Sequence, residues 1–212
     1  MRYYFILIFI CLMCSCTQDV SFMGIRPGMT ISEVISIAEE NENIIGLSPS
    51  QDEFFPNDNL TLNYTFHSNL RPDGVSQDIP FDCRISGYKD IVASIICSTH
   101  SCWANDEIIH LYYTKYKKPS LFVASKYNMD AIKKNDLLNI QICDTITEKD
   151  IDQYIQKKYT INYIWNIGTN SIRLSANDGL LMIFYQDDKI NKRMFDFFET
   201  EYEKDLRSKQ NI

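Results

Sequence analysis

The chain has 212 residues, of which 45% are hydrophobic and 23% are charged, and its formal net charge is −7. This length suits one large domain or two small ones, and the composition is typical of a folded globular protein. Because 28 acidic residues outnumber 21 basic ones, the charge argues against non-specific nucleic-acid binding and against a broad electrostatic hold on anionic lipid. We expect no nucleic-acid partner.

The sequence begins with a leader, MRYYFILIFICLMCSC, that predicts where the protein resides. Its only charge is Arg2, and Tyr3–Met13 is apolar or aromatic throughout, which is the pattern of a secretory signal peptide. The run is shorter than the roughly 20 apolar residues of a membrane-spanning helix. The small residue Ser15 stands directly before Cys16, and the polar residues 17–19 follow. This ending resembles a bacterial lipobox. The resemblance implies cleavage before Cys16 and lipidation of its thiol.

We therefore expect a lipid-anchored protein of the bacterial cell envelope, at the outer membrane or cell surface rather than the inner membrane. Two or three acyl chains would hold the protein to a membrane stably, where a single chain would not. The alternatives are lipidation at Cys14, plain secretion, and a retained N-terminal anchor helix. Loss of Arg2 with the leader leaves 20 basic residues against 28 acidic ones, so the mature net charge is 20 − 28 = −8.

Four cysteines follow the leader and Cys16, namely Cys83, Cys97, Cys102 and Cys143. An even number of cysteines in an exported protein favours disulfides, here with three possible pairings. The short spacing of Cys97 and Cys102 favours that pair, which leaves Cys83 with Cys143. The alternatives are buried free thiols, or a metal site built on Cys97, His100 and Cys102, whose spacing fits no standard zinc site.

The first half of the mature chain predicts a helix, three strands and a second helix. Thr30 and Glu33 have the spacing of a capping box, and the helix that they open ends in the polar run 39–43. The Ser-, Pro-, Asp- and Asn-rich residues 46–59 predict a loop. Alternating apolar residues predict strands at Leu60–Phe66 and Ile79–Ile85, and a turn at 86–90 joins the second of these to a third strand, Ile91–Cys97, as a hairpin. A helical period follows over Trp103–Lys118, with Asn105 or Asp106 as N-cap and Pro119 as the stop.

The second half repeats this order. Residues 120–124 predict a short strand, residues 126–136 are ambiguous, and residues 138–143 fit a strand or a linker. Two capping boxes, Thr145/Glu148 and Thr147/Asp150, are available to open the next helix. Three strands follow at Ile161–Ile167, Ile172–Leu174 and Leu180–Phe184. The polar residues 187–208 predict a C-terminal helix whose apolar stripe is Phe195, Phe198 and Tyr202.

The predicted fold class is α+β, with helices on one face of an antiparallel sheet, a tandem α/βββ repeat, and a C-terminal helix. The predicted organisation is a signal peptide at 1–15, a tether at 16–25, a first α/β half at 26–119, and a second at 120–212. The repeat requires that the strands of the two halves form equivalent meanders.

Several short segments resemble known families. Gly28–Val34 resembles the helix opening of outer-membrane-assembly lipoproteins of the SmpA/OmlA type, and the tandem arrangement is similar to the fold of beta-lactamase inhibitor proteins. A broader likeness links the chain to bacterial lipoproteins without assigned activity, through Phe22–Ile25, Lys115–Ser120 and Tyr185–Asp187 followed by Asn191. These resemblances imply a fold and an envelope address, and they imply no activity.

Residues able to support catalysis are few. The three histidines are His67, His100 and His110, and no Gly-rich phosphate loop, HExxH motif or Gly-x-Ser-x-Gly motif occurs. We expect no catalytic residue, metal or cofactor. The leading function is a non-catalytic lipoprotein that binds an envelope protein through sheet edges or a concave sheet face. The alternatives are glycan or small-ligand binding, with Trp103 and Trp165 available for stacking, and an exported thiol enzyme that pairs His100 with a cysteine.

Overall fold

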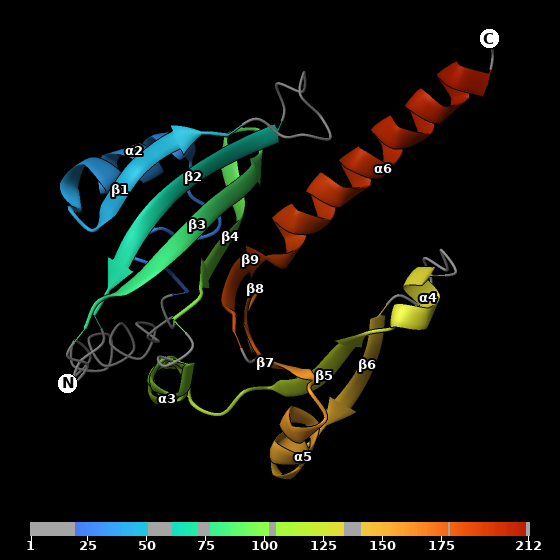
Figure 1. The fold of residues 1–212 in the computed structure, drawn as a ribbon. Helices are drawn as coiled ribbons and strands as arrows, with labels where there is room; N and C mark the ends of the chain where they lie inside the picture. Colours follow the sequence, from blue (N-terminus) through green and yellow to red (C-terminus); the bar gives the residue numbers. More distant parts are fainter. Residues whose placement is uncertain are drawn as a thin grey trace, which may run out of the picture.

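The computed structural model describes residues 20–50, 61–71, 77–101, 105–133, 141–177 and 179–210 (Figure 1). The leader, Cys16, Cys102 and Trp103 lie outside the described residues. The lipidation at Cys16 and the pairing of Cys97 with Cys102 therefore stay predictions.

The described strands form one nine-stranded sheet in the order β1-β2-β3-β4-β9-β8-β7-β5-β6, and every neighbouring pair is antiparallel. The predicted α+β class is confirmed. The strands are β1 (Ile44–Pro49), β2 (Thr61–Leu70), β3 (Ile79–Tyr88), β4 (Ile91–Thr99), β5 (Leu121–Tyr127), β6 (Gln141–Ile146), β7 (Thr160–Ile167), β8 (Asn170–Ala176) and β9 (Leu181–Asp187).

The sheet contains two meanders that meet at its centre. Strands β2, β3 and β4 pair in sequence, as do β7, β8 and β9, and the two meanders join where β4 pairs with β9. At this junction Ile95 lies opposite Tyr185, and Cys97 lies opposite Ile183. A helix precedes each meander, α2 (Ile31–Glu40) in the first half and α5 (Ile151–Gln156) in the second. The meanders required for the α/βββ repeat are therefore present, and the two halves share one core.

One face of the sheet carries the core. Along β3, the side chains of Ile79, Phe81, Cys83 and Ile85 are buried, whereas those of the residues between them are exposed or half-buried. The helices α2, α3 (Asn105–Tyr116) and α5 bring apolar side chains to the same core cluster. Phe22 and Ile25 also belong to this cluster, so the described residues 20–25 of the predicted tether pack into the domain.

The opposite face of the sheet meets α6 (Asp188–Gln210), which contacts β3, β4 and β9 and then extends beyond the sheet (Figure 1). The ring of Phe197 lies 5.3 Å from that of Tyr88, a residue on the face of β3 that points away from the core. Met194 is buried, whereas Phe195 is exposed. The predicted C-terminal helix is confirmed, but the placement of Phe195 in its packed stripe is wrong.

Local capping follows the predicted residue pairs in two places. The Glu33 carboxylate accepts a 2.7 Å hydrogen bond from the Thr30 backbone N–H, and the Thr30 hydroxyl accepts one from the Glu33 N–H, which completes the capping box of α2. In the second half, the Asp150 carboxylate accepts hydrogen bonds from the backbone N–H and hydroxyl of Thr147. The 3-10 turn η3 (Glu148–Asp150) follows Thr147 and leads into α5, whereas Thr145 lies in β6.

The edges of the sheet were the least predictable part. Strand β1 occupies the start of the predicted loop at 46–59, and β6 shows that residues 141–146 form a strand rather than a linker. A short helix, α4 (Met129–Lys133), lies in the segment that the sequence left ambiguous. The sequences of both edge strands alternate only weakly between apolar and polar residues. The pattern that identifies the central strands is therefore missing there.

Candidate functional site

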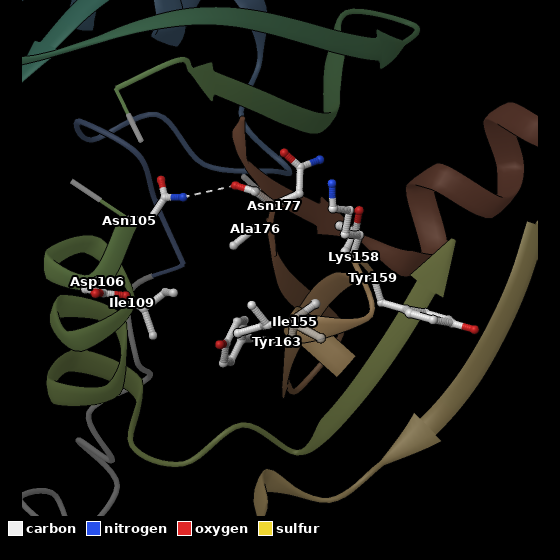
Figure 2. A pocket seen from close by; sticks show the side chains of 11 residues that line it. Asn105, Asp106, Ile109, Ile155, Lys158, Tyr159, Tyr163, Ala176 and Asn177 are labelled. Atoms are coloured by element: carbon white, nitrogen blue, oxygen red, sulfur yellow. Dashed lines mark hydrogen bonds between the residues drawn. The ribbon is translucent and has the colours of Figure 1, made fainter. Parts of the chain in front are cut away.

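A groove of about 520 Å³ opens between α3 and α5, above the ends of β7 and β8 (Figure 2). Its volume falls within the roughly 300–1,000 Å³ of small-molecule sites. It is formed by residues from both helices, from the loop after α5, and from the sheet. The lining residues are Asn105, Asp106, Ile109, Ile155, Lys158, Tyr159, Thr160, Ile161, Tyr163, Ala176 and Asn177.

The floor of the groove is apolar. Ile161 and Tyr163 alternate along β7 on the core face and are both buried, so the strand presents them to the helices. Ile109 of α3 faces Ile155 and Tyr163 across the groove, as Figure 2 shows. Ile155 is nevertheless exposed. An exposed apolar side chain beside a buried apolar floor gives a ligand a surface from which it would displace water.

The rim of the groove is polar on the side of α3. Asn105 begins this helix, and its Nδ2 donates a 3.3 Å hydrogen bond to the Asn177 carbonyl (Figure 2). The Oδ1 atom of Asn105 is buried and has no hydrogen-bond partner within the described part of the chain. Leaving such an acceptor unpaired costs about 1–3 kcal/mol. The Asp106 side chain belongs to the same rim and adds a negative charge to it.

Tyr163 places a phenol in the groove. Burial raises the pKa of Tyr163 to about 12, and the negative charges of Asp106, Asp152 and Glu148 act in the same direction. The hydroxyl therefore stays protonated, and able to donate a hydrogen bond, well above neutral pH. Lys158 supplies a cationic group to the lining from a left-handed backbone position with φ of 61°.

The structure places the three described cysteines on strands β3, β4 and β6. Cys83 and Cys97 lie opposite each other on β3 and β4, and both are buried. Cys143 is exposed on β6, at the far edge of the sheet. Because β3 is third and β6 is ninth in the strand order, the predicted pairing of Cys83 with Cys143 is wrong. All three described cysteines are free thiols.

The histidines and tryptophan lie apart from the groove. His67 Nδ1 lies 2.7 Å from Asp82 Oδ1 on the exposed face of the sheet, and His100 Nδ1 lies 3.2 Å from the Gly179 carbonyl. Trp165 is buried, and its Nε1 donates a 3.0 Å hydrogen bond to the Lys117 carbonyl. Its indole is therefore inaccessible for stacking on a sugar. Among the described residues, no cluster of three or more His, Cys, Asp or Glu side chains is placed to hold a metal.

The two edges of the sheet differ. Strand β1 has an irregular register between Ile45 and Ser48 and ends at Pro49, features that discourage the pairing of another strand. Strand β6 pairs with β5 in unbroken register along its six residues, contains neither Pro nor Lys, and leaves Ile142 43% exposed. Within the described residues, β6 is therefore the less protected edge, and a strand from a second chain could extend the sheet there.

Sequence reasoning missed the groove as a site. Asn105 and Asp106 were noticed only as helix caps, and the structure places Asn105 at the start of α3. The groove also needs Lys158 and Tyr163, which are more than 50 positions away in the sequence. No spacing motif connects these segments, because the tertiary pairing of β7 and the packing of α3 bring them together.

Comparisons with family models, with curated proteins and with solved structures found no match for this chain. The family resemblances drawn from short sequence segments therefore stay predictions. Within the described residues, none of the helices has the length and apolar character needed to cross a membrane.

Proposed function

We propose that the protein is a lipid-anchored envelope protein that binds a small hydroxylated ligand, such as a saccharide, in the groove between α3 and α5. The observation that carries the proposal is a groove whose lining combines buried apolar side chains, Ile161 and Tyr163, with the charged side chain of Asp106. The Asp106 carboxylate suits a ligand that presents hydroxyl or N–H donors. The apolar floor suits the C–H face of a sugar ring.

A binding role, rather than catalysis, suits the composition of the groove. Its described lining contains no His and no Cys, the residues that most often serve as general base or as thiol nucleophile. Asp106 and Lys158 are the charged groups of the lining, and they would orient a polar ligand. We therefore propose that the ligand leaves the groove chemically unchanged.

Removal of the Asp106 carboxylate tests the groove. With N-acetylglucosamine, chitobiose and glucose as probes, we expect Asp106→Ala to weaken the affinity for the bound saccharide about 10- to 100-fold. This range corresponds to about 1.5–3 kcal/mol for a hydrogen bond to a charged group. Isothermal titration calorimetry on the purified chain measures the change.

The matched control is Glu107→Ala, which removes one negative charge from the same first turn of α3 at a residue outside the groove lining. We expect its affinity to stay within about twofold of the unmodified protein. If both variants weaken the saccharide affinity equally, Asp106 acts through the net charge of the protein and not through a contact in the groove. Absence of millimolar binding by all three saccharides would contradict the ligand class.

The proposed address is tested by replacing the predicted lipid-bearing residue. In bacterial cells grown with labelled palmitate, we expect Cys16→Ser to abolish labelling and to move the protein out of the membrane fraction, because the mature chain then lacks its acyl chains. The control is Cys14→Ser, which should keep both the label and the membrane location. Continued labelling of the Cys16→Ser protein would disprove the assignment.

A second candidate function is protein binding along β6, favoured by the unbroken register and exposed Ile142 of this edge strand. The partner would add a strand to the sheet, so its backbone would supply most of the affinity. The membrane fraction prepared for the address test also serves here. A photoactivatable cross-linker on the exposed Cys143 should capture one stoichiometric envelope protein. The same cross-linker attached at position 199 of a Glu199→Cys variant should not.

A further inference from the structure

The hairpin of β3 and β4 brings two thiols together in the core. Cys83 and Cys97 are directly opposite in the antiparallel register, and both point to the core face, with exposed fractions of 4% and 0%. Their side chains also interact through a hydrogen bond. Burial and this hydrogen bond with Cys83 both raise the pKa of the Cys97 thiol. The hydroxyl of Ser68, on the neighbouring strand β2, lies 3.8 Å from Cys83 Sγ.

Directly opposed residues of an antiparallel pair have Cα atoms about 4.5–5.5 Å apart. Cysteines joined by a disulfide have Cα atoms about 4.4–6.8 Å apart. The register therefore gives the Cα atoms of Cys83 and Cys97 a separation that a disulfide can span, while their Sγ atoms are unbonded in the structure. The described Cys143 lies at the far edge of the sheet and does not compete for either residue.

A bulge in the hairpin creates this pairing. Near the turn, Gly87 pairs with Val92, whereas Ser86 pairs with Ser94, so Ala93 is the extra residue. An unbroken register would place Cys83 opposite Ile96 and turn Cys97 to the other face of the sheet, since side chains alternate along a strand. Gly87 permits the close approach of β4, because a Cβ atom there would lie 2.2 Å from the Ile91 carbonyl oxygen.

We propose that Cys83 and Cys97, in place of the pair Cys97 and Cys102 expected from sequence spacing, form a disulfide across the β3–β4 hairpin when the protein matures in an oxidising compartment. The in-cell part of this inference rests on the proposed envelope address. The two thiols lose two protons and two electrons as the S–S bond forms. The acceptor is the disulfide of a thiol–disulfide oxidoreductase or of oxidised glutathione, whose S–S bond breaks to give two thiols.

Oxidation precedes closure of the core. Both thiols are buried in the folded protein, so a bulky oxidant reaches them while the chain is unfolded or locally open. The bond then closes a ring over residues 83–97, which restricts the unfolded chain and stabilises the native one. The buried bond is also protected from reductants in the folded state.

Refolding of the purified full chain tests the pairing without reference to location. The Cys102→Ser/Cys143→Ser variant is reduced, denatured and refolded in glutathione buffer, and then digested with trypsin and Asp-N. We expect one cross-linked species that joins residues 82–84 to residues 90–105, each with a single cysteine. Reduction should lower the melting midpoint by on the order of 10 °C.

The matched control adds Cys97→Ser to the same background, and it should show neither the cross-link nor a response to reductant. Recovery of both cysteines as free thiols after oxidative refolding would overturn the pairing. In the protein with all its cysteines, a Cys97–Cys102 link in place of the Cys83 link would also overturn it.

Acid quenching of cells, followed by alkylation of free thiols in denaturant, separates this inference from the proposed address. With the natural leader, we expect the Cys83–Cys97 link to be present in cell extracts. If the link forms during refolding but both thiols are free in cells, the hairpin geometry is supported and the oxidising envelope address is overturned. Absence of the link in both experiments overturns the pairing alone and leaves the groove and the lipid anchor to their own tests.

Discussion

Replacing Trp165 with alanine is expected to destabilise the fold by about 3–5 kcal/mol, the typical cost of emptying a large aromatic site. Trp165 is 2% exposed, and its indole Nε1 donates a hydrogen bond to the Lys117 carbonyl. Its ring lies 5.9 Å from that of Tyr112 and 6.5 Å from that of Tyr163. The substitution would therefore leave a cavity between α3 and β7, together with an unpaired carbonyl.

Urea denaturation followed by circular dichroism measures this loss. The control is Tyr127→Ala, which removes an aromatic side chain that is 67% exposed and should change the free energy of unfolding by less than about 0.5 kcal/mol. Trp165→Phe should fall between the two, since it keeps a ring and loses the indole N–H. If Trp165→Ala costs no more than Tyr127→Ala, the packing of α3 on the second half of the sheet is wrong.

Alkaline pH is expected to unfold the protein through its buried tyrosines. Burial raises the pKa of Tyr112, of Tyr163 and of Tyr185 above the ordinary tyrosine value of 10, to about 12 for Tyr163. Above pH 10 the unfolded chain releases these phenolic protons while the folded chain retains them. Stability is thus complete below pH 10 and falls as the pH rises, by up to about 1.4 kcal/mol per pH unit for each such tyrosine.

Denaturation curves at several values between pH 9 and pH 12 measure this slope. Tyr163→Phe should make the slope shallower by up to about 1.4 kcal/mol per pH unit above pH 10, because one releasable proton is gone. Tyr127→Phe, at an exposed position, should leave the slope unchanged. A slope that is identical in the unmodified protein and the Tyr163→Phe variant would show that this phenol ionises equally in both states.

The central strands were predictable because each buries one face. Alternation along Ile79–Ile85 marked β3, and the same pattern marked β2 and β7, since burial on one side imposes a period of two. The capping box at Thr30 and Glu33 was equally local, and the structure contains it. The stripe of α6 was less predictable, because Met194 and Phe197 pack while the neighbouring Phe195 remains exposed.

The candidate site depended on contacts between distant segments. Asn105 meets Asn177 across 72 positions of sequence, and Asp106 and Tyr163 line the same groove because α3 of the first half packs over β7 of the second. Composition and spacing carry no information on such a pairing. Of the two tryptophans considered for stacking on a sugar, Trp103 lies outside the described residues and Trp165 is part of the core.

The sequence by itself determined which residues face the core within each regular strand, where α2 begins, and that a helix follows the last strand. These properties depend on neighbours within a few residues, through alternation, capping and turn chemistry. Only the tertiary structure decided which strands pair, and hence that Cys83 faces Cys97 and not Cys143. Backbone hydrogen-bonding groups are the same in every strand, so the choice of partner and the one-residue bulge at Ala93 follow from packing of the whole sheet.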